Sequence, residues 1–135
     1  MIQPGLGVQQ AMIAALVMRP TLTSLLGGAH VYDELPRGAT VPNVIFTTIE
    51  TRDWSVADQK AHESFVSLEI NSKSRGRAQA QSIIQEIETA LDGAPLTLTG
   101  HTLVNLRCVF ISAARPRTKD FFTATMRFRA ATEPQ

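Results

Sequence analysis

The fold of this chain is decided near its C-terminus by one stretch, Phe121-Phe-Thr-Ala-Thr-Met-Arg-Phe-Arg-Ala130. Successive residues of a β-strand point to opposite faces of the sheet. Here the even-numbered positions are apolar, and the odd-numbered positions after Phe121 are threonine or arginine. This alternation predicts a strand that buries one face and leaves the other open. Because the open face carries guanidinium and hydroxyl groups, and no carboxylate, histidine or cysteine, it favours contact with a partner over catalysis.

The rest of the chain predicts helices and strands that can pack on this strand. Apolar spacing and turn residues predict helices at 4–18, 21–26 and 75–91, a short extended piece at 30–32, and strands at 43–51, 62–71, 96–98, 101–113 and 121–130. Strands joined by short connections are most simply antiparallel neighbours. We therefore expect residues 1–135 to form a single α+β domain. Its mostly antiparallel sheet should carry the N-terminal helical segment and one long helix on one face, and residues 133–135 should be a frayed tail.

Composition excludes several classes of protein. A chain of 135 residues with 44% hydrophobic content can bury a core without metal or disulfide support. The net charge of +1 predicts no general attraction to nucleic acid or to a membrane surface. Cys108 is the only cysteine and lies in an apolar run, which predicts a buried structural thiol in a reducing compartment. No apolar stretch approaches the roughly 20 residues that a membrane span needs.

The charge is nevertheless uneven along the chain. From Arg107 to Arg129 there are six lysines or arginines and one acid, Asp120. This basic C-terminal third has three interpretations: a solvated face, a protein contact, or a contact with phosphate.

No catalytic motif stands out. The three histidines, His30, His62 and His101, lie far apart in sequence, and none has a partner at metal-binding spacing. Asp33 and Glu34 are adjacent and would point apart on an extended chain. The serines lack the context of a nucleophile elbow, and the glycines lack that of a phosphate-binding loop. We therefore expect no enzyme, no cofactor and no metal; a small hydrolase would need a pocket that gathers His62 or His101 with a carboxylate.

Three features suit contact with a partner. Trp54 stands beside Arg52 in a polar loop, and both residue types are enriched among interface anchors, although Trp54 could instead fold back onto its own sheet. The basic loop after residue 114 could meet an acidic partner, line a passage for DNA, or be a solvated turn. The arginines of the last strand could make contacts or guard the sheet against aggregation. The predicted interface residues are Arg52, Trp54, Arg115, Arg117, Lys119, Arg127 and Arg129.

Several runs, in order, resemble the tail terminator proteins, also called tail completion proteins, of long-tailed phages and gene transfer agents. The chain has Gly28-Ala-His-Val-Tyr-Asp-Glu-Leu-Pro36, which resembles the family's G-x-x-V-Y-D-x-x-P run. Its helix at 78–91 is similar to the pattern A-x-x-I-x-x-x-I-x-x-x-L. Leu96-Thr-Leu-Thr-Gly100 followed by Leu103-Val104, and Met126-Arg-Phe-Arg-Ala130, resemble two further family runs. The resemblance covers residues 4 to 131.

The resemblance implies a structural protein of the tail neck in a virion or phage-like particle, made in the bacterial cytoplasm. Such a protein forms a hexameric ring of identical copies at the head-proximal end of the tail tube. The ring would end polymerisation of the tube protein and join the tail to head completion or connector proteins. DNA would pass through the hole without sequence recognition, and no membrane is involved. The alternative is a small nucleic-acid-binding module that uses the basic C-terminal third.

Overall fold

The structure is a computed structural model that describes residues 3–73, 77–114 and 122–135. In chain order the elements are α1 (Pro4–Val17), α2 (Pro20–Leu26), β1 (Val31–Tyr32), β2 (Asn43–Asp53), β3 (His62–Ser72), α3 (Arg77–Leu91), β4 (His101–Ala114) and β5 (Phe122–Pro134). The strands form one five-stranded sheet in the order β1-β2-β3-β5-β4. Only β1 pairs in parallel, with β2, and the other pairs are antiparallel. The predicted α+β architecture is confirmed.

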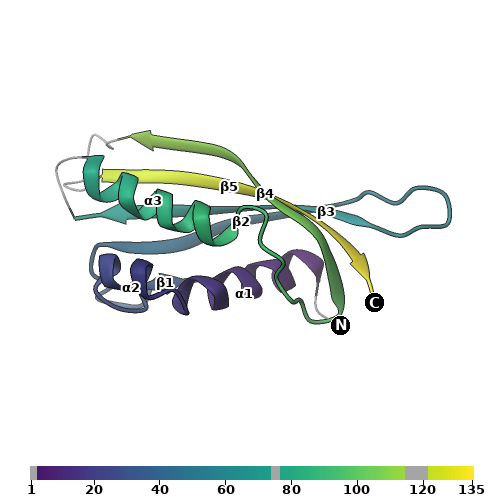
Figure 1. The fold of residues 1–135 in the computed structure, drawn as a ribbon, viewed down its shortest axis with the longest axis horizontal. Helices are drawn as coiled ribbons and strands as arrows, with labels where there is room; N and C mark the ends of the chain where they lie inside the picture. The colour runs from purple at the N-terminus through teal and green to yellow at the C-terminus, as the bar shows by residue number, and fades with distance from the viewer. Residues whose placement is uncertain (1–2, 74–76, 115–121) are drawn as a thin grey trace.

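All three helices lie on one face of the sheet (Figure 1). The core fills the space between the two layers, as the predicted alternation requires. Val8, Met12 and Leu16 of α1 are fully buried, and so are Met126 and Phe128 of β5. The opposite face carries no helix among the described residues, so its side chains are left for solvent or for a partner.

Gly5 allows α1 to approach the sheet closely. A Cβ atom at this position would lie 2.3 Å from Cγ2 of Ile49 and 2.7 Å from Oγ1 of Thr51. Both distances are shorter than van der Waals contact, so any larger residue would push the start of the helix away from β2. The absence of a side chain at Gly5 therefore sets the spacing between the two layers.

The helical layer is also tied together by one carboxylate. Glu86 of α3 accepts a hydrogen bond from Nε of Arg19 at 2.9 Å and a second from the hydroxyl of Thr21. These two hydrogen bonds hold the pKa of Glu86 below its ordinary value, and the one from Thr21 has the larger effect. The ionised carboxylate thus links the start of α2 to α3.

Two expectations for the C-terminal third were wrong. Residues 96–98 form no strand; this short segment follows Pro95, and it contributes Leu98, which is only 6% exposed, to the core. Residues 133–135 are not a frayed tail, because β5 runs to Pro134 and pairs there with the start of β4. The N–H of Gln135 also donates to the carbonyl of Gly100 at 3.3 Å.

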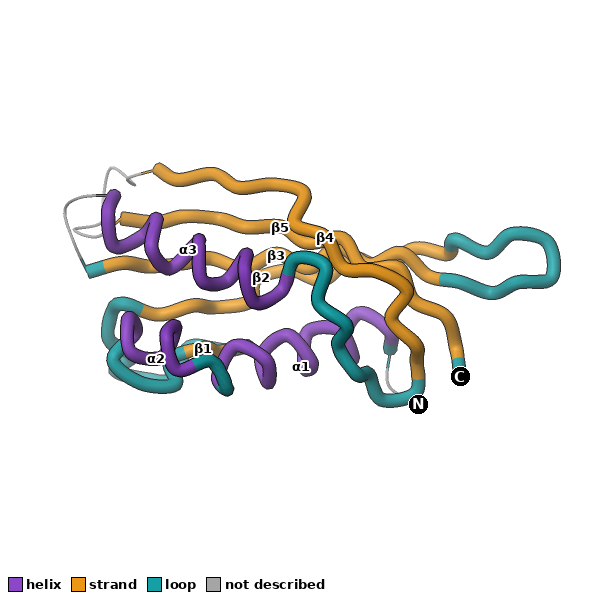
Figure 2. The backbone as a smooth tube through the Cα atoms, in the orientation of Figure 1, coloured by secondary structure: helices purple, strands orange, loops and turns teal. Residues whose placement is uncertain are grey.

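The hairpin formed by β2 and β3 projects beyond the helices (Figures 1 and 2). Both strands are longer than predicted, so the connection begins at Trp54, whose N–H donates to the carbonyl of Ala61 at 2.9 Å. The turn is closed by hydrogen bonds from the N–H and hydroxyl of Ser55 to the carboxylate of Asp53. Ala57 has a positive φ of 54°, a conformation that glycine adopts more easily.

Candidate assembly surface

The open face of the sheet gathers residues from three strands into neighbouring rows. The strand register places Glu50 of β2, Phe65 of β3 and Arg129 of β5 side by side. The next row toward the hairpin holds Arg52 beside Glu63. These residues point away from the helices because side chains alternate between the two faces of a strand, and the intervening Ile49, Thr51 and Ser64 lie on the helical side, beside Gly5. We call this set, with Trp54 and Arg127, the open-face cluster.

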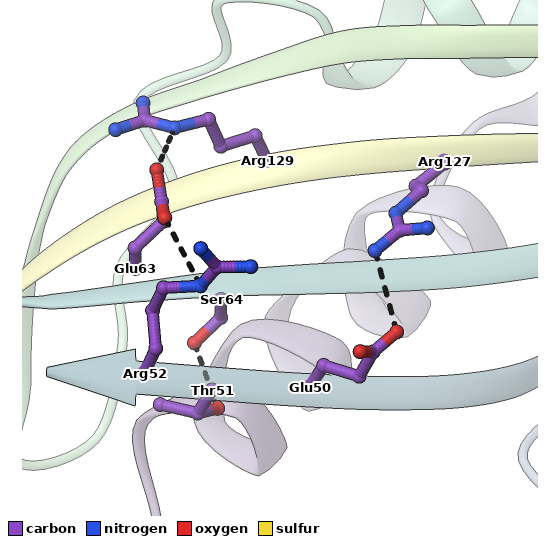
Figure 3. Close-up of polar contacts among 7 residues, drawn as sticks. All are labelled: Glu50, Thr51, Arg52, Glu63, Ser64, Arg127 and Arg129. Carbon is purple, nitrogen blue, oxygen red and sulfur yellow. Dashed lines mark hydrogen bonds and ion pairs between the residues drawn. The ribbon is translucent and has the colours of Figure 1, made fainter.

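Glu63 is the centre of the open-face cluster (Figure 3). Its Oε2 accepts a hydrogen bond from Nε of Arg129 at 2.5 Å, and its Oε1 lies 3.5 Å from Nε of Arg52. The side chains of Arg129 and Glu63 are 24% and 14% exposed, whereas that of Arg52 is 68% exposed. The same carboxylate therefore makes one largely buried ion pair and one exposed ion pair.

A third ion pair and an aromatic ring extend the cluster. Nη2 of Arg127 donates to Oε1 of Glu50 at 3.3 Å (Figure 3). The ring of Phe65 lies 4.8 Å from the guanidinium carbon of Arg127 and 5.4 Å from that of Arg52. Guanidinium groups at this distance are attracted by the ring quadrupole. The arginines are therefore held in place by both charge and stacking.

Trp54 lies at the hairpin end of the same face. Its ring centre is 4.9 Å from the guanidinium carbon of Arg129, yet 46% of the residue remains exposed. Trp54 also lines a shallow groove of about 190 Å³ together with Val56, Ala61 and Val104. Trp54 thus contacts its own sheet, as one interpretation predicted, and it keeps a large exposed surface; the other interpretation, that it anchors a partner, stays a prediction.

The structure brings together four of the seven predicted interface residues. Arg52, Trp54, Arg127 and Arg129 are joined through shared carboxylates and rings on one face. The other three, Arg115, Arg117 and Lys119, lie outside the described residues. A role of any of the seven in an interface stays a prediction.

The basic C-terminal third is neutralised by acids from elsewhere in the sequence, as far as the described residues show. Arg107 pairs with Asp92 at 3.2 Å, and Arg127 and Arg129 pair with the two glutamates of the open-face cluster. Sequence analysis missed Glu50, Glu63 and Phe65. Alternation along residues 62–71 carried a usable signal, because it places Glu63 and Phe65 on the face opposite Val66.

No catalytic or metal-binding constellation forms in the described part of the chain. The rings of His62 and His101 lie 6.4 Å apart, edge to face. No group of three or more histidine, cysteine, aspartate or glutamate residues within residues 3–73, 77–114 and 122–135 could hold a metal ion. Cys108 is half-buried, and this burial is the main reason why the pKa of its thiol lies above the ordinary value. In the described residues no helix is both long and apolar enough to cross a membrane.

The described residues thus form an α+β domain with one sheet face that no helix covers. Residues 10–133 match the family described as "Tail completion protein gp17". The match spans nearly the whole chain, and the chain therefore belongs to the tail completion protein gp17 family. No curated protein matches the sequence.

A solved structure supports the same assignment. It is a chain of the "Virion of native gene transfer agent (GTA) particle", to which this chain is similar with a TM-score of 0.86 and 26% sequence identity. The match covers 94% of this chain and 95% of that chain, so the two share the whole domain. The predicted resemblance to tail completion proteins is confirmed.

Proposed function

We propose that this chain is a structural component of the tail of a virion or phage-like particle. In this proposal copies of the chain form a ring, hexameric as the family resemblance implies, at the head-proximal end of the tail tube. The ring ends polymerisation of the tube protein and joins the tail to the head completion proteins, and DNA passes through its hole. The role requires no catalysis.

The observation that carries this proposal is the open-face cluster. An entire sheet face lacks a helical cover in the described structure, yet its side chains are fixed by ion pairs and ring contacts. Fixed side chains lose little rotamer freedom on contact with a partner, which favours binding. A head-to-tail interface between identical copies closes into a ring when its rotation is suitable.

Trp54 gives the sharpest test of this surface. Replacing one well-buried anchor costs about 2–4 kcal/mol per interface, and the loss recurs at every joint of a ring. Trp54→Ala should therefore weaken ring formation or head attachment, while circular dichroism shows an intact fold. Leu35→Ala is a matched control, since Leu35 is similarly exposed at 42% and lies outside the cluster.

Light scattering and negative-stain imaging of the purified proteins measure the outcome. A ring in the wild type and in Leu35→Ala, with smaller species in Trp54→Ala, supports the proposal. Normal rings and normal head attachment in Trp54→Ala would show that Trp54 has no role in assembly.

The nucleic-acid-binding alternative makes a different prediction. A module that binds phosphate shows DNA affinity that falls steeply with salt. The described arginines of the basic third are already paired with carboxylates, and DNA that slides through a hole should not be held tightly. We expect filter binding to detect only weak, sequence-independent retention of DNA at physiological salt.

A further inference from the structure

Among the described residues, each of the two outer edges of the sheet is partly covered and partly left without a pairing strand. On one side β4 is the edge strand, and on the other side β2 is covered only by the two-residue strand β1. Unpaired strand edges invite pairing with another chain, and proteins usually block them with charge, proline or a covering segment. The two bare halves of this sheet therefore call for an explanation.

The turn after α3 blocks the outer edge of β4 at Leu106 and Cys108. The N–H of Gly93 donates to the carbonyl of Leu106 at 2.7 Å, and the N–H of Cys108 donates to the carboxylate of Asp92 at 2.8 Å. These bonds occupy backbone groups of β4 that point away from β5. The turn thus protects the middle of this edge, and no described residue outside β4 and β5 bonds to the backbone of β4 beyond Cys108.

The remaining half of β4 is apolar, and within the described part of the chain its outer edge is bare. Val109, Phe110 and Ile111 are consecutive and are 50%, 51% and 42% exposed. No described residue pairs with this part of the strand on its outer side. Residues 109–114 contain no charge and no proline. A run of three exposed apolar residues on an unprotected edge is an aggregation hazard unless a partner covers it.

The β2 edge shows the complementary arrangement. β1 pairs only with Val44 and Ile45, and the N–H of Val44 donates to the carbonyl of His30 at 2.9 Å. From Thr47 to Asp53 every residue is exposed, and no described residue pairs with the outer side of this segment. Its charged side chains are engaged within the chain, so they do not repel an uncharged strand.

The direction of the strands indicates how the two bare edges can meet. Each neighbouring pair from β2 through β3 and β5 to β4 is antiparallel, so β2 and β4 run in opposite directions. When β2 of a second copy in the same orientation lies beside β4, it continues the antiparallel sheet. Copies that share one orientation around an axis form a head-to-tail ring, whereas two β4 edges would pair only as a closed dimer.

We propose that the bare half of β4, residues 109–114, pairs with the bare half of β2, residues 47–53, of a second copy of this chain. This inference rests on the proposed ring and specifies the joint between its subunits. The side chains of Phe110 and Ile111 become covered on the two faces of the resulting continuous sheet, and the unpaired backbone groups of both edges are satisfied across the joint.

Cysteine cross-linking tests the joint directly. Thr48 and Ser112 are exposed, and their register partners place both on the open face. In a Cys108→Ser background we would compare Thr48→Cys, Ser112→Cys and the double variant after treatment with a short bismaleimide, which tolerates a small shift along the strands. A head-to-tail joint predicts no cross-linked species from either single variant and a ladder from dimer to closed ring from the double variant.

Each other outcome of the cross-linking has a defined meaning. Dimers from Ser112→Cys alone would overturn the proposal in favour of pairing between two β4 edges. A ring seen by light scattering without a ladder overturns the edge pairing and leaves the ring intact. A ladder without a closed ring supports the edge pairing and overturns the ring. A wild type that stays monomeric and a double variant without cross-links overturn both.

A charge on the bare edge provides an independent check. Phe110→Lys should reduce the mass measured by light scattering to that of the monomer, because lysine on an edge strand opposes pairing. Met18→Lys is the matched control, since Met18 is 79% exposed on the helical layer, and it should leave the mass unchanged. An unchanged mass in Phe110→Lys contradicts the proposal.

Discussion

Replacing Glu63 by glutamine would separate the two ion pairs that share this carboxylate. The substitution keeps the shape of the side chain and removes its charge. Glu63 bonds to Arg129 within a largely buried pair, whereas Arg52 is mostly exposed. Water screens an exposed pair strongly and a buried pair weakly. We therefore expect the two interactions to contribute unequally to stability, although both end on the same carboxylate.

The structure sets the expected magnitudes. Exposed ion pairs contribute about 0.2–1 kcal/mol in double-mutant cycles, and breaking a fully buried pair costs about 3–5 kcal/mol. The exposed fractions of 24% and 14% place the Arg129–Glu63 pair between these limits, at a coupling of about 1–2 kcal/mol. The coupling of Arg52 to Glu63 should not exceed about 0.5 kcal/mol.

Two double-mutant cycles measure these couplings. Glu63→Gln is combined with Arg129→Met in one cycle and with Arg52→Met in the other, and the free energy of unfolding is obtained from urea titrations. In 1 M salt, where the Debye length is about 3 Å, the smaller coupling should disappear and the larger should persist. Equal couplings, or a larger coupling for Arg52, would refute the assignment of Arg129 as the principal partner.

Three further substitutions test the fold that supports this surface. Gly5→Ala should lower the free energy of unfolding by about 1–2 kcal/mol, because the cost of overpacking outweighs the gain of about 1 kcal/mol in helix propensity. A variant that is more stable than the wild type in urea titrations would contradict the close packing of α1 on β2. Ala57→Gly should raise the free energy of unfolding by about 0.5–1 kcal/mol, because the positive φ of 54° is strained for alanine, and an unchanged urea midpoint would show that the turn relaxes. Hydrogen bonds from Ser55 hold the pKa of Asp53 below its ordinary value of 3.8, so the carboxylate stabilises the turn above that pH and this contribution is lost as the pH falls through the lowered pKa. The protection of the Ser55 amide proton against exchange should therefore fall with the protonation of Asp53 in the wild type, and Asp53→Asn should lack this pH dependence.

The sequence was sufficient to predict most of the fold. Alternation in β5 and the helical spacing of α3 correctly predicted which side chains enter the core, because burial follows the period of each element. Residues 96–98 were predicted wrongly for a physical reason. Two leucines separated by one polar residue fit a strand, but here Leu98 is buried in the core by a connecting segment that pairs with no strand.

The composition of the open-face cluster could be predicted only in part. Arg127 and Arg129 follow directly from alternation within one strand. Their carboxylate partners lie 77 and 66 residues away in sequence, and these pairings depend on the register between strands. Register is set by tertiary packing and turn geometry, and no single segment carries it. The segment from Arg107 to Arg129 therefore looked basic, although its described arginines are paired.

The internal pairing of the arginines also bears on how this surface could work in assembly. A free arginine that enters an interface must be ordered, at a cost of about 0.5–1.5 kcal/mol for a rotamer-rich side chain, and its charge must be desolvated. Arg129 already has a carboxylate on Glu63 and a ring on Trp54 as partners before any contact with a second molecule. It can therefore enter an interface as part of a nearly neutral, preordered group.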